Sequence, residues 1–337
     1  MSLPEPIKRV IIEQWSFLAE ATLEPTAQGS SNTTYFVHVP PDKQFVLKLH
    51  SATTKTAQIY YEHSLLTFLQ HTELPFSIPV PIHAACGETL IPVEVHGQFL
   101  MIALLPRLVG QIMDRRNLNQ IQSAGSALAK LHDQLAKFDP QGQLAQLPFW
   151  GELAQIHPRV SDPLAIPQML NLGLEEQQQL AQLLNETIEV APHLYKTLPI
   201  QTIHADYIAP NILVESDRVV GILDFEYATR DLRLLDYLSS LDQFASFPWK
   251  EVRFGDIVRA FSMGYQVYSS LTKAEMESAI SVWQLQRASS LIYWTGWMIE
   301  GKGNRQKVTD AVLETLRFEP WLKFNQEALL INTLGFI

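Results

Sequence analysis

The fold is decided by the stretch from His204 to Glu226. It reads His-Ala-Asp-Tyr-Ile-Ala-Pro-Asn-Ile-Leu-Val-Glu-Ser-Asp-Arg-Val-Val-Gly-Ile-Leu-Asp-Phe-Glu. Two apolar runs of β-type residues, 212–214 and 219–223, lie on either side of a polar turn and predict a β-hairpin. We expect this hairpin to bring Asn211, which precedes it, close to Asp224, which follows it.

Three oxygen-bearing side chains in this stretch suit phosphoryl transfer from ATP. Such a transfer needs a carboxylate that orients the attacking hydroxyl and accepts its proton, and oxygen ligands that hold Mg²⁺ against the phosphates. Asp206 can be the base, Asn211 can supply a neutral metal ligand, and Asp224 can supply the main metal carboxylate. Each residue alone is more typical of a turn or a cap, and His204 alone is more typical of a structural histidine. The ordered set His-x-Asp-x4-Asn, hairpin, Asp is much more specific than its parts.

The rest of the chain predicts a small α+β lobe followed by a mostly helical one. In the first part we expect helices at 7–17 and 60–70, a hairpin from 33–39 and 44–49, and strands at 89–95 and 98–105. Pro106 closes that part, and amphipathic patterns at 121–135 and 173–185 follow it, with only the two runs of the 204–226 stretch interrupting the helices. The sequence therefore predicts two domains, 1–105 and 106–337.

Lys48 lies on the second strand of the first expected hairpin. Side chains alternate along a strand, so Val46 and Lys48 share one face. There Val46 could touch adenine and Lys48 could reach the α- and β-phosphates. An exposed edge-strand lysine is the more typical interpretation in isolation, and the stretch around Asp206 reverses that preference. Glu62 on the next helix is the expected partner of Lys48, with Glu73, past the helix end, as a weaker alternative.

The polar segment 29–35, Gly-Ser-Ser-Asn-Thr-Thr-Tyr, lies where a phosphate-covering loop should be. Ser30, Ser31 and Asn32 leave backbone N–H groups and polar side chains for phosphate oxygens. The segment has one glycine rather than three, so it is a weak signal alone. No Walker-type Gly-x4-Gly-Lys-Ser/Thr occurs in the sequence, which excludes the P-loop route to ATP.

The 204–226 stretch resembles the catalytic loop of the aminoglycoside phosphotransferase and choline kinase superfamily, which shares the protein-kinase fold. The resemblance implies an α+β, two-lobed fold, with an antiparallel sheet and one helix in the small N-terminal lobe and a larger helical C-terminal lobe. It implies Asp206 as the catalytic base, with Asn211 and Asp224 as Mg²⁺ ligands. The residues implied to bind the nucleotide, ATP, are Lys48, Glu62, Val46, Ser30, Ser31, Asn32, Leu213 and Ile222. His204 would brace the loop through backbone contacts, and Asp236 would support it. The site would be a cleft between the lobes.

Within that superfamily, the segments 29–37 and 203–211 look closest to the type II homoserine kinase-like branch. The resemblance also covers 124–133 and extends to residue 241, but it does not reach 140–200 or 245–337, where substrate contacts are expected. Tyr207 departs from the branch's pattern. The implied reaction transfers the γ-phosphate of Mg-ATP to a hydroxyl of an amino alcohol or amino sugar. Homoserine is one candidate beside aminoglycosides.

Two features bear on the acceptor. Asp224 and Asp236 are too close in sequence for the activation segment with which a protein kinase holds a peptide, so a small molecule is expected. The acids nearby could hold a substrate amine or be solvated surface carboxylates, and the arginines could bind a substrate carboxylate or pair with those acids. These acids are Glu226, Asp231 and Asp242, and the arginines are Arg230 and Arg233.

The composition limits the partners. Apolar residues make up 47% and charged residues 18% of the 337, enough for a large core. The net charge of -10 argues against nucleic acid, which needs clustered Lys and Arg. Cys86 is the only cysteine, which excludes an intrachain disulfide and fits a reducing compartment. No apolar run approaches the roughly 18 residues of a membrane helix, and 1–17 lacks a signal-peptide pattern. We expect a cytoplasmic protein without a membrane partner; the oligomeric state and the choice between ATP and GTP stay open.

Two other interpretations remain open from the sequence. The first is a catalytically silent, kinase-like nucleotide-binding or regulatory protein. Loss of Asp206, Asn211, Asp224 or Lys48 would favour it, and all four are present. The second is a metal hydrolase that uses His204, Asp206 and Asp224, but the other histidines are scattered and offer no ligand spacing.

Overall fold

The chain divides into two compact units. The computed structural model describes residues 3–26, 32–245 and 250–327. The first unit consists of Met1–Gln111, Phe138–Gln146 and Val220–Glu226, and the second of Ile112–Lys137, Leu147–Val219 and Tyr227–Ile337. This division differs from the one expected at residue 105, because two short segments from the later part of the chain belong with the N-terminal unit.

The first unit is built on a five-stranded antiparallel sheet in the order β1-β2-β3-β5-β4. Its elements are α1 (Glu5–Gln14), η1 (Ser16–Leu18), β1 (Thr22–Pro25), β2 (Thr33–Val39), β3 (Lys43–His50), α2 (Thr56–Gln70), β4 (Ile91–Val95) and β5 (Gln98–Pro106). The predicted hairpin is β2–β3, and Lys48 lies opposite Thr34 on one side and Ala103 on the other. Lys48 therefore lies on the central strand, which excludes the edge-strand interpretation.

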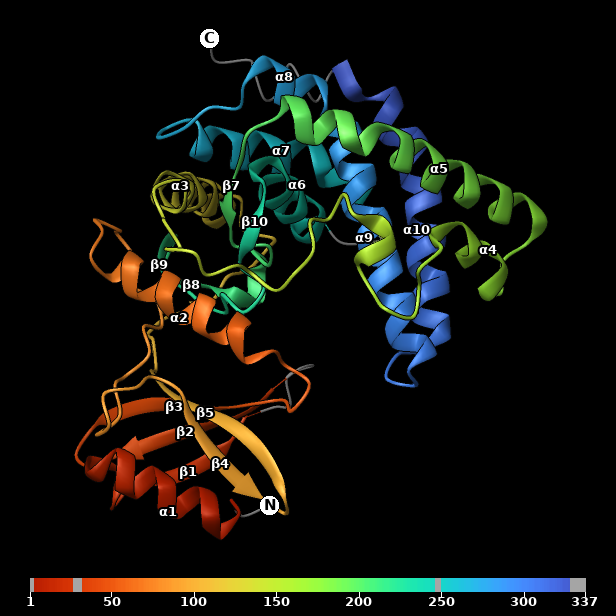
Figure 1. Ribbon diagram of the computed structural model, residues 1–337. Helices are drawn as coiled ribbons and strands as arrows, with labels where there is room; N and C mark the ends of the chain where they lie inside the picture. The colour runs from red at the N-terminus through yellow and green to blue at the C-terminus, as the bar shows by residue number, and fades with distance from the viewer. Residues whose placement is uncertain (1–2, 27–31, 246–249, 328–337) are drawn as a thin grey trace. The chain divides into compact units, whose positions relative to one another are not determined.

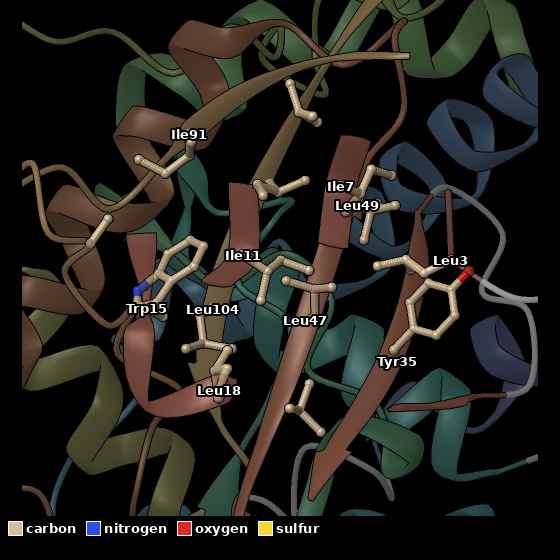
Figure 2. Close-up of a cluster of buried hydrophobic side chains, with 14 residues drawn as sticks. Leu3, Ile7, Ile11, Trp15, Leu18, Tyr35, Leu47, Leu49, Ile91 and Leu104 are labelled. Atoms are coloured by element: carbon tan, nitrogen blue, oxygen red, sulfur yellow. The ribbon is translucent and has the colours of Figure 1, made fainter. Parts of the chain in front are cut away.

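The two faces of β3 carry different side chains, as the alternation predicted. Leu47 and Leu49 pack with Ile7 and Ile11 of α1 in one buried apolar cluster, which covers one face of the sheet (Figures 1 and 2). The helix expected at 7–17 is α1 followed by the short turn η1, so the unit has a second helix beside α2. Because α1 seals the Leu47 face, Lys48 is left on the opposite face of the sheet.

The second unit is mainly helical. From Gln111 on, the elements are β6 (Gln111–Ile112), α3 (Leu118–Leu135), η2 (Leu153–Gln155), η3 (Pro163–Ala165), α4 (Ile166–Met169), α5 (Leu174–Thr197), β7 (Ile200–Ile203), η4 (Ala209–Asn211), β8 (Ile212–Glu215), β9 (Arg218–Ile222), β10 (Thr229–Leu232), α6 (Arg233–Phe244), α7 (Lys250–Tyr265), α8 (Lys273–Glu277), α9 (Ala279–Ile299) and α10 (Arg305–Phe324). The predicted hairpin is β8–β9, which forms a sheet in the order β6-β8-β9. None of the described helices combines the length and hydropathy of a membrane-spanning segment.

The prediction that a single hairpin interrupts the helices is wrong. Two further strands, β7 and β10, pair antiparallel, with Ile203 opposite Thr229 and Ile200 opposite Leu232. Each has four residues, too short to show alternation in the sequence. This sheet matters for the site because β7 ends just before His204 and β10 leads directly into α6.

Candidate active site

Asp206 lies in a loop of the second unit between β7 and η4. The preceding residue, Ala205, has φ of 63°, in the left-handed region that residues other than glycine rarely adopt. The carboxylate of Asp236, on the first turn of α6, stabilises this turn. Its Oδ1 accepts the N–H of Ala205 at 2.6 Å and its Oδ2 accepts the N–H of His204 at 2.7 Å. Asp236 thus supports the loop, as expected, through two charge-assisted bonds to the backbone.

His204 and Tyr207 fix the loop from inside the unit. His204 is fully buried, and its Nδ1 accepts the N–H of Asp206 at 3.2 Å. The buried ring of Tyr207 packs edge-on against His204, and its hydroxyl donates to the carbonyl of Ala124 at 2.9 Å. The side chain that departs from the family pattern is therefore an anchor between the loop and α3.

Asp206 and Asn211 are in direct contact. Nδ2 of Asn211 donates to Oδ2 of Asp206 at 2.8 Å and to its carbonyl oxygen at 3.0 Å. Both residues are half-buried. Since the Asn211 nitrogen is bonded to Asp206, its amide oxygen is the atom that can serve a hard cation such as Mg²⁺.

Lys48 of the first unit is buried among three carboxylates, with 7% of its surface exposed. Its Nζ lies 2.9 Å from Oε2 of Glu226, 3.5 Å from Oδ1 of Asp224 and 3.7 Å from Oε1 of Glu62. The predicted ion pair with Glu62 is present, and Glu226 is an additional partner. Burial lowers the pKa of Lys48, but the three carboxylates together outweigh it and raise the pKa above its ordinary value.

The carboxylates around Lys48 outnumber it. Three acids against one ammonium leave an excess of negative charge, which a further cation would balance. The side chain of Asp224 is 39% exposed, whereas those of Glu62 and Glu226 are 6% and 17% exposed. Burial raises the pKa of Glu62 to about 7 against the opposing effect of Lys48. Carboxylate oxygens are donors of the kind that a divalent metal such as Mg²⁺ prefers, and Asp224 is the most exposed of the three acids.

Asn32 connects the start of β2 to this cluster. Its Oδ1 accepts the N–H of Ser51 at 3.1 Å, and its Nδ2 donates to Glu226. The Asn32 side chain is thus tied to the Lys48 cluster. Ser30 and Ser31, the other expected phosphate-loop residues, lie outside the described residues.

Three apolar residues were expected at the nucleotide. Val46 is half-buried on the Lys48 face of β3, and Ile222, at the end of β9, is fully buried in the same unit. Leu213 of β8 is buried in the second unit. Their contacts with a nucleotide stay predictions.

Comparison with known proteins identifies the family. A sequence model described as "Phosphotransferase enzyme family" matches residues 22–271. The chain belongs to this phosphotransferase family. Homoserine kinase from Polaromonas naphthalenivorans (strain CJ2) is 28% identical over 281 residues, which cover 81% of this chain and 80% of that protein. These matches confirm the predicted enzyme class, a small-molecule kinase of the homoserine kinase-like branch.

Solved structures show the same fold. The microcompartment-associated aminopropanol kinase matches this phosphotransferase with a TM-score of 0.74 at 18% identity, over 95% of this chain and 98% of that one. An amicoumacin kinase in complex with AMP-PNP, Ca²⁺ and Ami matches with a TM-score of 0.69 at 12% identity, over 93% and 92% of the two chains. The predicted kinase-like fold is confirmed.

Asp231 of this phosphotransferase is not a solvated surface acid. It is fully buried, accepts the Tyr195 hydroxyl and accepts the N–H of Trp150 at 2.8 Å. Burial raises the pKa of Asp231 to about 6, although Tyr195 and Trp150 oppose the shift. Its partners are distant in sequence, so the pattern around Asp231 did not reveal them.

The other acids and arginines considered for the acceptor are also largely committed to internal contacts. Asp242 is buried, 2.6 Å from Nη2 of Arg287, and it accepts Nε1–H of Trp283 at 3.0 Å. Arg233 pairs with Glu275 at 2.7 Å rather than with the nearby acids. Arg230 is exposed. Asp242 and Arg233 therefore have internal partners and are not free to bind an acceptor. Those partners lie more than 40 residues away in the sequence, so the residues around Asp242 and Arg233 do not indicate them.

Proposed function

We propose that this phosphotransferase moves the γ-phosphate of Mg-ATP to a hydroxyl of a small amino alcohol, with Asp206 as the base. The observation that carries the proposal is the contact between Asp206 and Asn211 in a loop that Asp236 holds. The contact fixes a carboxylate and an amide oxygen in one loop. Phosphoryl transfer needs one of each there, a carboxylate as base and a neutral oxygen as metal ligand.

Each remaining residue of the predicted site has a role in this proposal. Asn211 and Asp224 are the ligands of Mg²⁺, which when bound neutralises phosphate charge. Lys48 binds the α- and β-phosphates, and Glu62 orients its ammonium. Asn32 offers polar groups to the phosphates. Val46, Leu213 and Ile222 supply apolar contacts to adenine.

The acceptor class follows from what the relatives have in common. Homoserine and aminopropanol, named for two of the similar kinases, each carry one hydroxyl and one amine. We therefore take an amino alcohol as the acceptor and homoserine as the first to test. Amino sugars and aminoglycosides are the second class.

The test is ADP release by the purified chain with Mg-ATP and a panel of homoserine, aminopropanol, amino sugars and aminoglycosides. Asp206→Ala should lower turnover about a thousandfold and leave nucleotide affinity within about twofold, because a positioned base accelerates a reaction by roughly 10²–10⁴. Asp224→Ala should remove the Mg²⁺ dependence of nucleotide binding. Asp133→Ala, at an exposed ion pair with Lys137, is the control.

Two results would count against the proposal. Turnover of Asp206→Ala at the parent rate would show that another group is the base. ADP release with amino sugars but with neither amino alcohol would move the acceptor to the second class.

A further inference from the structure

The helices α3 and α7 of the second unit lie next to each other (Figure 1). Two glycines, one on each helix, lie where they cross. A Cβ on Gly125 would lie 2.1 Å from the carbonyl oxygen of Phe261, and one on Gly264 would lie 1.8 Å from that of Gln122. Oγ of Ser126 also donates to the carbonyl of Gly264 at 2.9 Å. The two backbones are therefore in contact, and no larger residue fits at either glycine without separating the helices.

This crossing brings Tyr265, the residue after Gly264, to His132 on α3. The Tyr265 hydroxyl lies 2.9 Å from Nδ1 of His132, and the rings meet edge-on with centroids 5.8 Å apart. His132 is 2% exposed and Tyr265 is 1% exposed, so water does not compete for the bond. Burial raises the pKa of Tyr265 to about 12, so its hydroxyl keeps its proton near neutral pH.

The other ring nitrogen of His132 reaches the carboxylate that holds the Asp206 loop. Nε2 lies 3.2 Å from Oδ2 of Asp236, the oxygen that also accepts the N–H of His204. Asp236 is 1% exposed. A carboxylate only accepts hydrogen bonds, so Nε2 must carry a proton here. In a neutral ring Nδ1 is then bare and accepts the proton of the Tyr265 hydroxyl.

Asp236 requires the Nε2-protonated tautomer of His132, and the Tyr265 hydroxyl stabilises the same tautomer by donating to the bare Nδ1. Without the hydroxyl the buried Nδ1 has no donor, which weakens the hold of the ring on the Asp236 carboxylate. The carboxylate would then be free to shift, and with it the left-handed turn at Ala205. The Asp206 carboxylate directly follows that turn.

We propose that His132 and Tyr265 are positioning residues that fix the Asp206 loop through Asp236. Neither residue touches the reacting groups; they act through the chain Tyr265, His132, Asp236 and the backbone N–H groups of His204 and Ala205. The catalytic part of the inference rests on the proposed role of Asp206. The structural part, that α7 controls the loop, does not.

The first test compares two buried tyrosines. Tyr265→Phe removes only the hydroxyl and should lower kcat about tenfold, with KM for ATP within about twofold, as expected for one hydrogen bond in a charged network. Tyr237→Phe is the matched control, because its buried hydroxyl bonds Ser262 of the same α7 at 2.6 Å. The control should keep the parent kcat. Equal kcat values for the two variants would overturn the inference.

The second test separates the two nitrogens of His132. His132→Gln places an N–H near the position of Nε2, whereas His132→Asn reaches only toward Tyr265. The Gln variant should keep kcat about tenfold above the Asn variant, and Tyr265→Phe should have no further effect in the Asn background. Equal rates for Gln and Asn, or fully additive losses, would mean that His132 only fills space. This pair also decides the matter if Tyr265→Phe does not fold.

A third readout needs no turnover. Exchange of the backbone amide hydrogens at 204–206 should be about tenfold faster in Tyr265→Phe than in Tyr237→Phe. If Asp206 proves not to be the base, this difference persists and the proposed function alone fails. If exchange is unchanged, the positioning inference fails and the role of Asp206 is untouched.

Discussion

Two buried carboxylate sites of this phosphotransferase, one in each unit, are stabilised in opposite ways. Asp236 is surrounded by donors: two backbone N–H groups and the ring of His132. Lys48 is surrounded by acids: Glu62, Asp224 and Glu226. The first site balances its charge with hydrogen bonds and is complete without a ligand. The second holds more acids than bases, an excess that favours the binding of a cation. In the proposed function the first site positions the loop and the second receives a charged ligand.

Two buried histidines show the same contrast. Both ring nitrogens of His132 have a hydrogen-bond partner. In the described part of the chain, Nε2 of His50 has none, and its ring is 6.5 Å from that of His63. His50 follows Lys48 by two residues on β3. Burial lowers the pKa of His50 and of His63, and the ammonium charge of Lys48 lowers both further. The Lys48 cluster thus keeps its neighbouring histidines neutral, whereas both ring nitrogens of His132 beside Asp236 have hydrogen-bond partners.

The largest effect on stability is expected for Asp236→Asn. The amide offers one acceptor in place of two, and its NH₂ faces N–H donors, so the loop or His132 loses a charge-assisted bond. We expect the free energy of unfolding to fall by about 3 kcal/mol, the cost of leaving buried donors unpaired. Chemical denaturation measures it, with the exposed Asp217→Asn as control. A loss no larger than that of Asp217→Asn would show that the turn at Ala205 does not depend on Asp236.

A smaller effect, visible only against pH, is expected for His50→Leu. Burial first, then Lys48 and His63, lower the pKa of His50 to about 2 in the folded chain. The unfolded chain, with a pKa of about 6.5, binds more protons below that value, so falling pH destabilises the fold. Between about pH 7.5 and 5.5 the titration of His50 should lower the free energy of unfolding by about 1.4 kcal/mol, and His50→Leu should remove this loss.

The measured quantity is the difference in the free energy of unfolding between the parent and His50→Leu at each pH. The raised pKa values of Glu62 and Asp231 act in the opposite direction, because their folded forms bind protons more readily than the unfolded chain, and they cancel in that difference. His83→Leu, at an exposed histidine, should show the parent's pH dependence. If the free energy of unfolding of His50→Leu depended on pH as that of the parent does, His50 would not contribute to the loss of stability at low pH.

The sequence predicted the parts of the site that are set by local spacing. Alternation along β3 placed Lys48 opposite the Leu47 face, and the position of Glu62 on the next helix made it the expected partner of Lys48. The order of His204, Asp206 and Asn211 implied a single loop, and the structure shows contacts of that kind. In each case the partners are close in the chain or lie on adjacent elements, so strand alternation and a short ordered motif were sufficient.

The missing parts depend on contacts between distant segments. The sequence makes Glu226 a candidate for binding the acceptor, whereas in the structure it pairs with Lys48, far earlier in the chain. The Tyr265–His132–Asp236 chain joins three helices through a crossing of two glycines that lie far apart in the sequence. The one available signal was the pair of glycines in otherwise good helical patterns, which indicates a close approach of backbones.

The smallest change in stability is expected for Glu62→Gln, in the Lys48 cluster of the first unit. The substitution is the same carboxylate-to-amide change as Asp236→Asn, but it removes one of three acids that repel each other around Lys48. Lys48 keeps Asp224 and Glu226, so the free energy of unfolding should change by less than about 1 kcal/mol. Without Glu62 the ammonium is drawn toward the other two acids, and kcat/KM for ATP should fall about tenfold or more. Denaturation and ADP release on the same preparation measure both quantities, with Glu73→Gln as control. A stability loss near that of Asp236→Asn would make the cluster a structural site, and the contrast between the two units would disappear.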